Sequence, residues 1–119
     1  MTAPEMICHL NDSFRVGMGE KYASPDTNPL KRTLVKWVAL RTSLTWPQGV
    51  STRPELIQGN GGTPPSEWTR DCAELENLMA AFAARQSYSL HPIFGVMSQE
   101  EWLIWGYRHV DHHLRQFGV

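Results

Sequence analysis

The residues with the clearest capacity for chemistry are three histidines near the end of the chain, in the run HVDHH at 109–113. His109 and His113 are four residues apart, so on a helix their imidazole rings project in the same direction. This is the spacing by which H-x-x-x-H sequences chelate a metal ion. Neutral imidazole suits zinc, nickel, copper or iron(II). The pair therefore predicts two ligands of a transition-metal site.

A third ligand has to come from elsewhere, because catalytic metal sites have three protein ligands and one open position. On its own helix wheel, His9 flanks an apolar face that includes Leu10 and Phe14. It is the natural third ligand if the first and last helices pack side by side. His91, in a loop, is either a distant further ligand or a loop anchor, and spacing alone leaves the choice between His9 and His91 open. The competing interpretation is that the histidines are structural and bond backbone carbonyls at the edge of the core.

The last helix has to present the pair correctly, and a wheel at about 100° per residue places its faces. His109 and His113 lie at the edge of the buried face, bracketed by Trp102 and Trp105, while His112 lies further toward solvent. The wheel assigns the core to an aliphatic face made of Leu103, Tyr107, Val110, Leu114 and Phe117.

Four helical segments are predicted: one begins at 2 and ends between 17 and 22, and the others lie at 29–43, 66–85 and 98–117. The first and last begin with the S/T-x-x-E spacing of a capping box. The stretch 44–65 is rich in Gly and Pro and predicts a long irregular loop between helices two and three. No strand-like alternation is sustained. We expect one all-α domain over 1–119, an antiparallel four-helix bundle. The second helix carries a stripe that includes Leu30, Leu34 and Trp37.

Composition and charge exclude several classes of protein. The chain has 119 residues and a formal charge of -1, from 11 basic and 12 acidic side chains, so a basic nucleic-acid-binding face is not expected. No apolar run is long enough for a membrane span, and the N-terminus lacks the pattern of a signal peptide. Cys8 and Cys72 have no C-x-x-C spacing, which favours free thiols in a reducing cytoplasm. A redox role for Cys8 beside His9 is disfavoured, because adjacent helix residues do not face each other.

Several short segments resemble a DinB-like family of unknown function, and together they cover nearly the whole chain. They are MICHL (6–10), WP (46–47), GGTPP (61–65), HPIFG (91–95), EEW (100–102) and YRHVDHHLRQFG (107–118). The resemblance implies a DinB/YfiT-like four-helix bundle. It also implies that three histidines hold a divalent metal ion, most often zinc or nickel. The matching positions in this chain are His9, His109 and His113.

The same resemblance implies a function. Some members of the superfamily are thiol S-transferases that use bacillithiol, or mycothiol-dependent isomerases. We therefore expect a metal-dependent thiol S-transferase or hydrolase-type enzyme, with a low-molecular-weight thiol as cofactor or substrate, bound to the metal as thiolate. Asp12, Glu101 and Asp111 do not share the histidine face, so none is an obvious general base. The alternative is a non-catalytic binding or stress-associated bundle with structural histidines.

The chain departs from its relatives at the N-terminus. Relatives usually have a further helix before the one that carries His9, whereas this chain starts at that helix. Either the gene start lies upstream of Met1, or the helix is absent and leaves an apolar groove. A second copy of the chain would cover such a groove, so a homodimer is expected.

Overall fold

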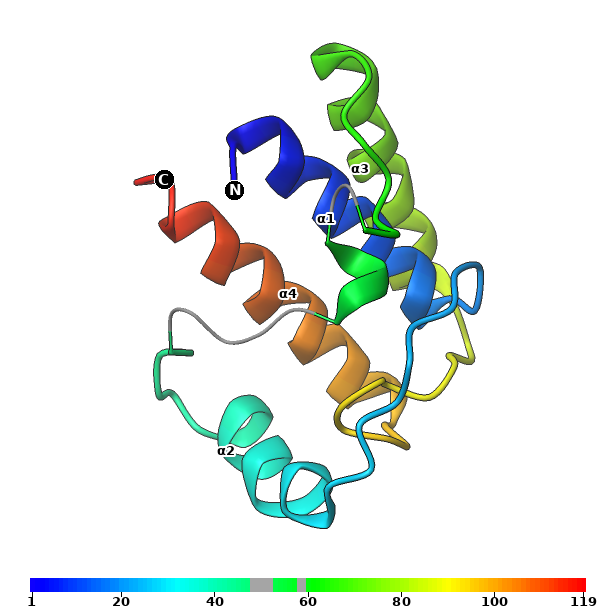
Figure 1. Cartoon of the computed structure of the whole chain (residues 1–119). Helices are drawn as coiled ribbons and strands as arrows, with labels where there is room; N and C mark the ends of the chain where they lie inside the picture. The colour runs from blue at the N-terminus through cyan, green and yellow to red at the C-terminus, as the bar shows by residue number, and fades with distance from the viewer. Residues whose placement is uncertain (48–52, 58–59) are drawn as a thin grey trace. The chain divides into compact units, whose positions relative to one another are not determined.

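The structure is a computed structural model that describes residues 1–47, 53–57 and 60–119 (Figure 1). Over these ranges it contains no β-strand, and a single antiparallel bridge joins His91 to Gly95. The prediction of an all-α chain with four helices is confirmed, and this architecture is compatible with a helical bundle. The helices are α1 (Ala3–Gly17), the π-helix η1 (Lys31–Val35), α2 (Lys36–Arg41), the 3-10 helix η2 (Pro54–Leu56), α3 (Trp68–Ala84) and α4 (Gln99–Arg115).

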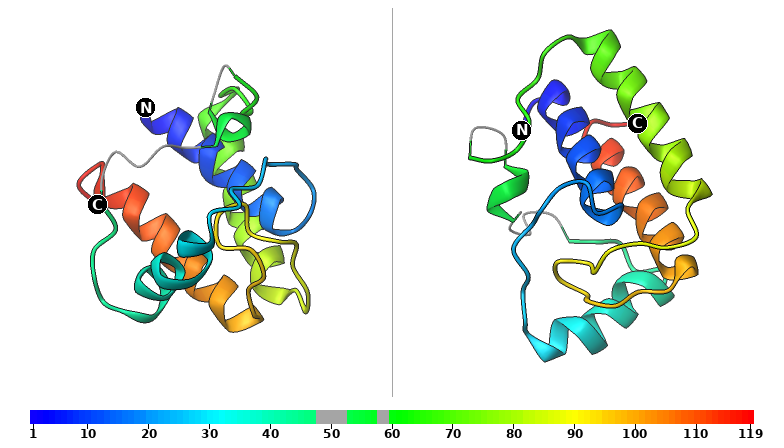
Figure 2. Two further views of the ribbon diagram at one scale, coloured as in Figure 1. Left: turned by 60° about the horizontal axis from the view of Figure 1, so that its bottom comes forward. Right: turned by 90° about the vertical axis from the view of Figure 1, so that its right-hand side faces the viewer.

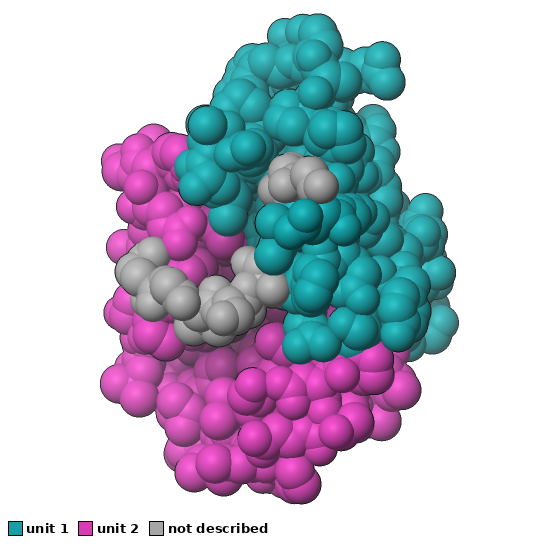
Figure 3. All heavy atoms as spheres, viewed as in Figure 1, with its two compact units in different colours: residues 1–24, 52–89 teal, residues 25–51, 90–119 magenta. Residues whose placement is uncertain are grey.

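The chain divides into two compact units (Figure 3). Unit 1 comprises residues 1–24 and 52–89 and contains α1, η2 and α3. Unit 2 comprises residues 25–51 and 90–119 and contains η1, α2 and α4. The prediction of one domain over 1–119 stays a prediction.

Unit 1 is built on the packing of α1 against α3, which lie side by side in the views of Figures 1 and 2. The rings of Phe14 and Phe82 meet edge to face with centroids 4.9 Å apart, a geometry that adds to the free energy of burying two aromatic side chains. The start of α1 follows the prediction, because Thr2 and Glu5 form the complete capping box. The predicted start of α1 is therefore confirmed.

The buried part of α1 includes polar side chains as well as apolar ones. Asn11, Asp12 and Ser13 are all buried, and each has a hydrogen-bond partner within unit 1. Ser13 donates to the carbonyl oxygen of His9 and Asn11 donates to that of Asp71. Buried polar groups are tolerated when they are bonded in this way.

Asp12 holds the segment that leads into α3. Its side chain is fully buried and accepts hydrogen bonds from the backbone N–H of Thr63 at 2.7 Å and from the hydroxyl of Thr63 at 2.8 Å. Arg15 forms an ion pair with Asp12 at 3.3 Å and with Glu74 at 2.7 Å. The pair with Glu74 is shorter, but Glu74 is half-exposed, so we expect Asp12 to contribute more to stability.

We expect Asp12→Ala to lower the free energy of unfolding by about 2–3 kcal/mol, because it removes a fully buried carboxylate that accepts two hydrogen bonds from Thr63 and pairs with Arg15. Urea denaturation followed by circular dichroism measures the change. Glu74→Ala is the matched control, since it removes the other carboxylate from Arg15, and a loss of about 0–1 kcal/mol is expected for such a surface pair. Equal losses for the two variants would contradict this account.

Unit 2 is built on α4, which begins at the predicted capping box of Ser98 and Glu101. Its buried residues are Trp102, Trp105, Gly106 and His113. The two indole rings meet edge to face with centroids 5.1 Å apart. The core of α4 is therefore an aromatic face that ends in a histidine.

The predicted aliphatic core face of α4 is wrong. Tyr107 is 74% exposed, Leu103 is 40% exposed and Phe117 is 39% exposed. The two tryptophans outweigh these side chains because burial of large aromatic rings removes the most apolar area from water. The buried arc of the helix is consequently centred on the tryptophans and His113, so the histidine pair lies nearer the middle of that face than the wheel suggested.

The apolar stripe on the second helix also lies differently from what its pattern indicates. Leu30, Leu34 and Trp37 are each more than half exposed. Toward α4, the helix instead presents Lys36, whose ammonium group donates to the carbonyl of Val96 and lies 3.3 Å from Glu101. Polar contacts, rather than the apolar stripe, orient this helix in unit 2.

The predicted loop 44–65 is irregular where it is described, apart from η2. Residues 48–52 and 58–59 of that predicted loop lie outside the described residues. Leu56 of η2 is buried in unit 1, and Trp46 is half-buried in unit 2. Among the described residues, no helix is long and apolar enough to cross a bilayer.

Candidate metal centre

The predicted pair is formed in unit 2. His109 and His113 lie one turn apart on α4, and their rings meet edge to face, with centroids 4.8 Å apart and planes at 81°. His113 is buried and His109 is half-buried. The i, i+4 spacing thus brings two imidazoles to one place, as the sequence indicated.

His113 is hydrogen-bonded to Gln116, the residue that follows α4. Its Nδ1 lies 2.9 Å from the amide oxygen of Gln116. An amide oxygen can only accept, so Nδ1 carries the hydrogen and donates it. The lone pair of a neutral ring is then on Nε2, which is the arrangement of a histidine that binds a metal through Nε2.

His109 is stacked in an aromatic environment. Trp105 lies almost parallel to it, with centroids 4.8 Å apart and planes at 19°, and Trp46 lies at 6.1 Å. The indole N–H of Trp46 donates to the carbonyl of Ala39. Aromatic contacts from two different segments therefore restrict the His109 ring.

Arg108 fastens the Trp46 segment to α4. Its guanidinium donates to the carbonyl oxygens of Ala39, Thr42 and Leu44 and lies 5.6 Å from the centroid of the Trp46 ring. The carbonyls at the end of α2 have no helical partners of their own, so Arg108 satisfies them. The same contacts keep Trp46 beside the histidine cluster.

His112 is half-buried, as His109 is, although the wheel placed His112 further toward solvent. Its ring lies 5.9 Å from Trp46 and 5.1 Å from His113 between centroids. Burial lowers its pKa, against the opposing effect of the carboxylate of Asp111. Its Nε2 lies 3.5 Å from the amide nitrogen of Gln116. His112 is thus next to the pair and is linked to it through Gln116.

His9 lies on α1 in unit 1 and is 3% exposed. Its Nδ1 lies 3.4 Å from the carbonyl oxygen of Leu56 in η2, which can only accept, so Nδ1 is the donor and Nε2 carries the lone pair. Burial lowers the pKa of His9, although the Leu56 carbonyl and Asp12 act in the other direction. His9 therefore resembles His113 in having an oxygen acceptor beside Nδ1.

His91 is used differently from the other histidines. Its Nδ1 accepts the backbone N–H groups of Ile93 at 3.1 Å and Phe94 at 3.0 Å. Its ring stacks on Phe94 with centroids 4.6 Å apart, and Trp102 and Trp105 lie within 5.6 Å. Of the two roles left open for His91, the geometry favours the loop anchor, because the Nδ1 lone pair is already taken.

The acidic side chains considered as bases are each engaged elsewhere. Asp111 forms an ion pair with Arg115 at 2.8 Å, and Glu101 closes the capping box and lies beside Lys36. Asp12 holds Thr63. The expectation that none of these three serves as a general base is consistent with these contacts.

The two cysteines are free, as predicted. The thiol of Cys8 is buried and lies 3.8 Å from a carboxylate oxygen of Asp71. Burial, reinforced by the negative charge of Asp71, raises the pKa of Cys8 to about 11. A reactive cysteine needs a lowered pKa, so the geometry adds to the case against a redox role.

Gln116 is the residue that the sequence reasoning missed. It follows α4 directly and lies three residues after His113 and four after His112. That double spacing, with an amide that can both donate and accept, is a signal that was available in the sequence.

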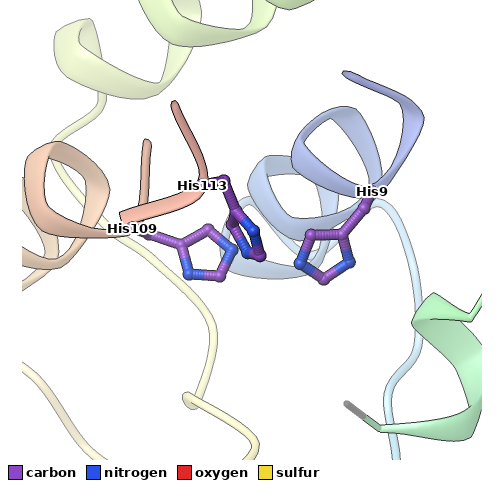
Figure 4. A group of neighbouring side chains, drawn as sticks. All are labelled: His9, His109 and His113. Atoms are coloured by element: carbon purple, nitrogen blue, oxygen red, sulfur yellow. The ribbon is translucent and has the colours of Figure 1, made fainter. Parts of the chain in front are cut away.

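By their donor atoms, His9, His109 and His113 are a group that could hold a metal ion (Figure 4). Three neutral imidazoles are a donor set that suits zinc and other late first-row metals. Fold and residues together define a class: an all-helical protein with a candidate three-histidine site.

The chain belongs to the DUF1569 family, described as a protein of unknown function, whose model matches residues 3–118. No curated protein and no solved structure matches the chain.

Proposed function

We propose that this protein binds one divalent transition-metal ion through the Nε2 atoms of His9, His109 and His113, and that it is a DinB-like metalloprotein with an antiparallel four-helix bundle. The observation that carries the proposal is the proton arrangement of the ligands. In their own units, His9 and His113 each direct Nδ1–H to an oxygen acceptor. Metal-binding histidines almost always have such an acceptor on the nitrogen that does not bind the ion.

Zinc or nickel is the ion we propose, because a neutral all-nitrogen donor set does not suit magnesium or calcium. Three protein ligands leave a coordination position for a small molecule. Such an ion supplies Lewis acidity, which lowers the pKa of a bound thiol or water molecule at that position. The protein's own residues then orient the ligands: Leu56 for His9, Gln116 for His113 and Trp105 for His109.

For the reaction, we propose transfer of a low-molecular-weight thiol to an electrophile, with a hydrolytic reaction as the variant in which water takes the open position. This follows from the DinB-like resemblance and from the engagement of Asp12, Glu101 and Asp111 in other contacts. Because those carboxylates are engaged in other contacts, we propose that the metal ion, rather than a general base, would activate the thiol or water molecule. A homodimer and a cytoplasmic location stay predictions.

The test is metal content of the protein purified without a histidine tag. After removal of adventitious ions with a chelator, the protein is titrated with Zn²⁺ or Ni²⁺ and analysed for bound metal. We expect about one ion per chain, as for a three-ligand protein site, and a higher melting temperature with metal, because an ion that binds only the folded state stabilises it. Binding far below one ion per chain, with no thermal shift, would refute the proposal.

The thiol step is tested separately with the Co²⁺-substituted protein. We expect an added small thiol to enter the coordination sphere and change the visible spectrum, since thiolate is a soft ligand for such an ion. An unchanged spectrum, in a protein that does bind cobalt, would contradict the proposed transferase activity but not the proposed metal site.

The second candidate function is a non-catalytic bundle with structural histidines. His91 favours it, because this chain already uses one buried histidine purely as an anchor of a loop. The metal titration separates the two functions, since structural histidines hold no ion.

A further inference from the structure

Gln116 connects two histidines of the cluster through a single amide group. Its oxygen lies 2.9 Å from Nδ1 of His113, and its nitrogen lies 3.5 Å from Nε2 of His112. Its backbone N–H donates to the carbonyl oxygen of His113 at 3.2 Å, and the N–H of Phe117 donates to that of Leu114 at 2.9 Å. The backbone bonds place the residue, and the side chain is then directed back along the helix.

The direction of this amide decides which nitrogen of His113 carries the proton. The amide oxygen only accepts and the amide nitrogen only donates. With the oxygen on His113, the ring is protonated at Nδ1 and its lone pair lies on Nε2. With the amide reversed, Nδ1 would have to accept, and Nε2 would hold the hydrogen in the neutral ring.

His112 favours the first direction. An unprotonated Nε2 on His112 accepts from the amide nitrogen, which keeps the amide oxygen on the side of His113. Because this contact is long, it favours one orientation of the amide group without excluding the other. The third histidine of the run, which does not belong to the candidate ligand group, thereby acquires a role.

We propose that Gln116 is a positioning residue that sets the proton of His113 on Nδ1, oriented in turn by His112. This inference rests on the proposed function for its purpose, because it explains how Nε2 of His113 is presented to a metal ion. The proton position itself is a property of the protein without metal, so it is tested without assuming that an ion binds.

The first experiment is ¹⁵N NMR of histidine-labelled, metal-free protein at about pH 8, where an ordinary histidine is neutral. We expect His113 to be protonated at Nδ1 in the wild type and in Gln116→Glu, because a carboxylate also accepts. Gln116→Leu is expected to lose this preference. Gln86→Leu, which makes the same change at an exposed loop position, is expected to behave as the wild type. A wild-type His113 protonated at Nε2, or an unchanged proton position in Gln116→Leu, would overturn the inference.

The second experiment measures Zn²⁺ affinity of the same four proteins by competition with a chelator. Loss of a hydrogen bond behind a ligand costs about 10- to 100-fold in affinity. We expect a loss near 10-fold for Gln116→Leu, since water can replace an exposed side chain, and affinity at least equal to the wild type for Gln116→Glu.

The two experiments separate this inference from the proposed function. If the wild type binds no metal while His113 shows the expected proton position, the metal site fails and the role of Gln116 in setting the proton stands. If the wild type binds metal and Gln116→Leu binds it as tightly, Gln116 does not position the ligand.

Discussion

Replacement of both His109 and His113 with alanine is expected to weaken Zn²⁺ binding by about four orders of magnitude. Structural zinc sites with four ligands have apparent binding free energies of about 10–16 kcal/mol, or about 3 kcal/mol per ligand. Loss of two ligands therefore costs about 6 kcal/mol, and each 1.4 kcal/mol is about a tenfold change in affinity. Competition with chelators of graded affinity measures the change.

The matched control is His112→Ala, which removes a histidine from the same helix but not from the candidate ligand group. It is expected to stay within about 10-fold of the wild type, because its link to the pair is the long contact through Gln116. His113 is buried, so the double variant is first compared with the wild type by circular dichroism without metal. A folded double variant that binds as tightly as the wild type would exclude the pair as ligands, as would an equal loss in His112→Ala.

The second large effect expected is a loss of stability in acid caused by His91. Burial, together with the positive charge of Lys36, lowers the pKa of His91 to about 3, from a usual value of 6.5. Its Nδ1 also accepts two backbone N–H groups and so has no place for a proton. Below pH 6.5, His91 takes up a proton in the unfolded chain but not in the folded chain, and this difference favours unfolding.

The sign and the window follow from these two pKa values. Above about pH 6.5 His91 is neutral in both states and adds no pH dependence. Between about pH 6.5 and about pH 3 it lowers the free energy of unfolding by about 1.4 kcal/mol per pH unit, on the order of 5 kcal/mol in all. Urea midpoints of the metal-free protein from pH 7 downward measure the slope.

His91→Asn is the comparison that isolates this histidine. The Asn side-chain oxygen can accept the same two N–H groups, as in an Asx turn, but it does not titrate. We expect the variant to be less stable at neutral pH, because the ring contacts with Phe94, Trp102 and Trp105 are lost. Its stability should fall less steeply with acid than that of the wild type. Parallel pH profiles for the two proteins would show that His91 is not the group responsible.

Local rules predicted the boundaries of the helices well. The capping boxes at Thr2 and at Ser98 begin α1 and α4 where the sequence placed them. The third helix was expected over 66–85, and α3 runs over Trp68–Ala84. These features depend on contacts three or four residues apart, so the sequence contains all the information that they need.

Faces were predicted less well than boundaries. The wheel of α4 ranked aliphatic residues above tryptophan, and Leu30, Leu34 and Trp37 were grouped as one apolar stripe. In unit 2, Trp102 and Trp105 are buried, whereas that stripe is exposed. Which face of an amphipathic helix is covered depends on the segments that pack on it. Here those segments are the loop that carries His91 and the Trp46 segment that is bound to Arg108.

By itself, the sequence determined the pairing of His109 with His113, because helical geometry brings residues i and i+4 together in any surroundings. Only the tertiary structure decided what each histidine does. Leu56 is 47 residues from His9 in the chain, yet its carbonyl oxygen is the acceptor that lies beside Nδ1 of that ring. His91 is a loop anchor because the loop places the N–H groups of Ile93 and Phe94 beside its Nδ1. A proton position depends on which acceptor lies within about 3 Å, and distances between remote segments are a property of the fold.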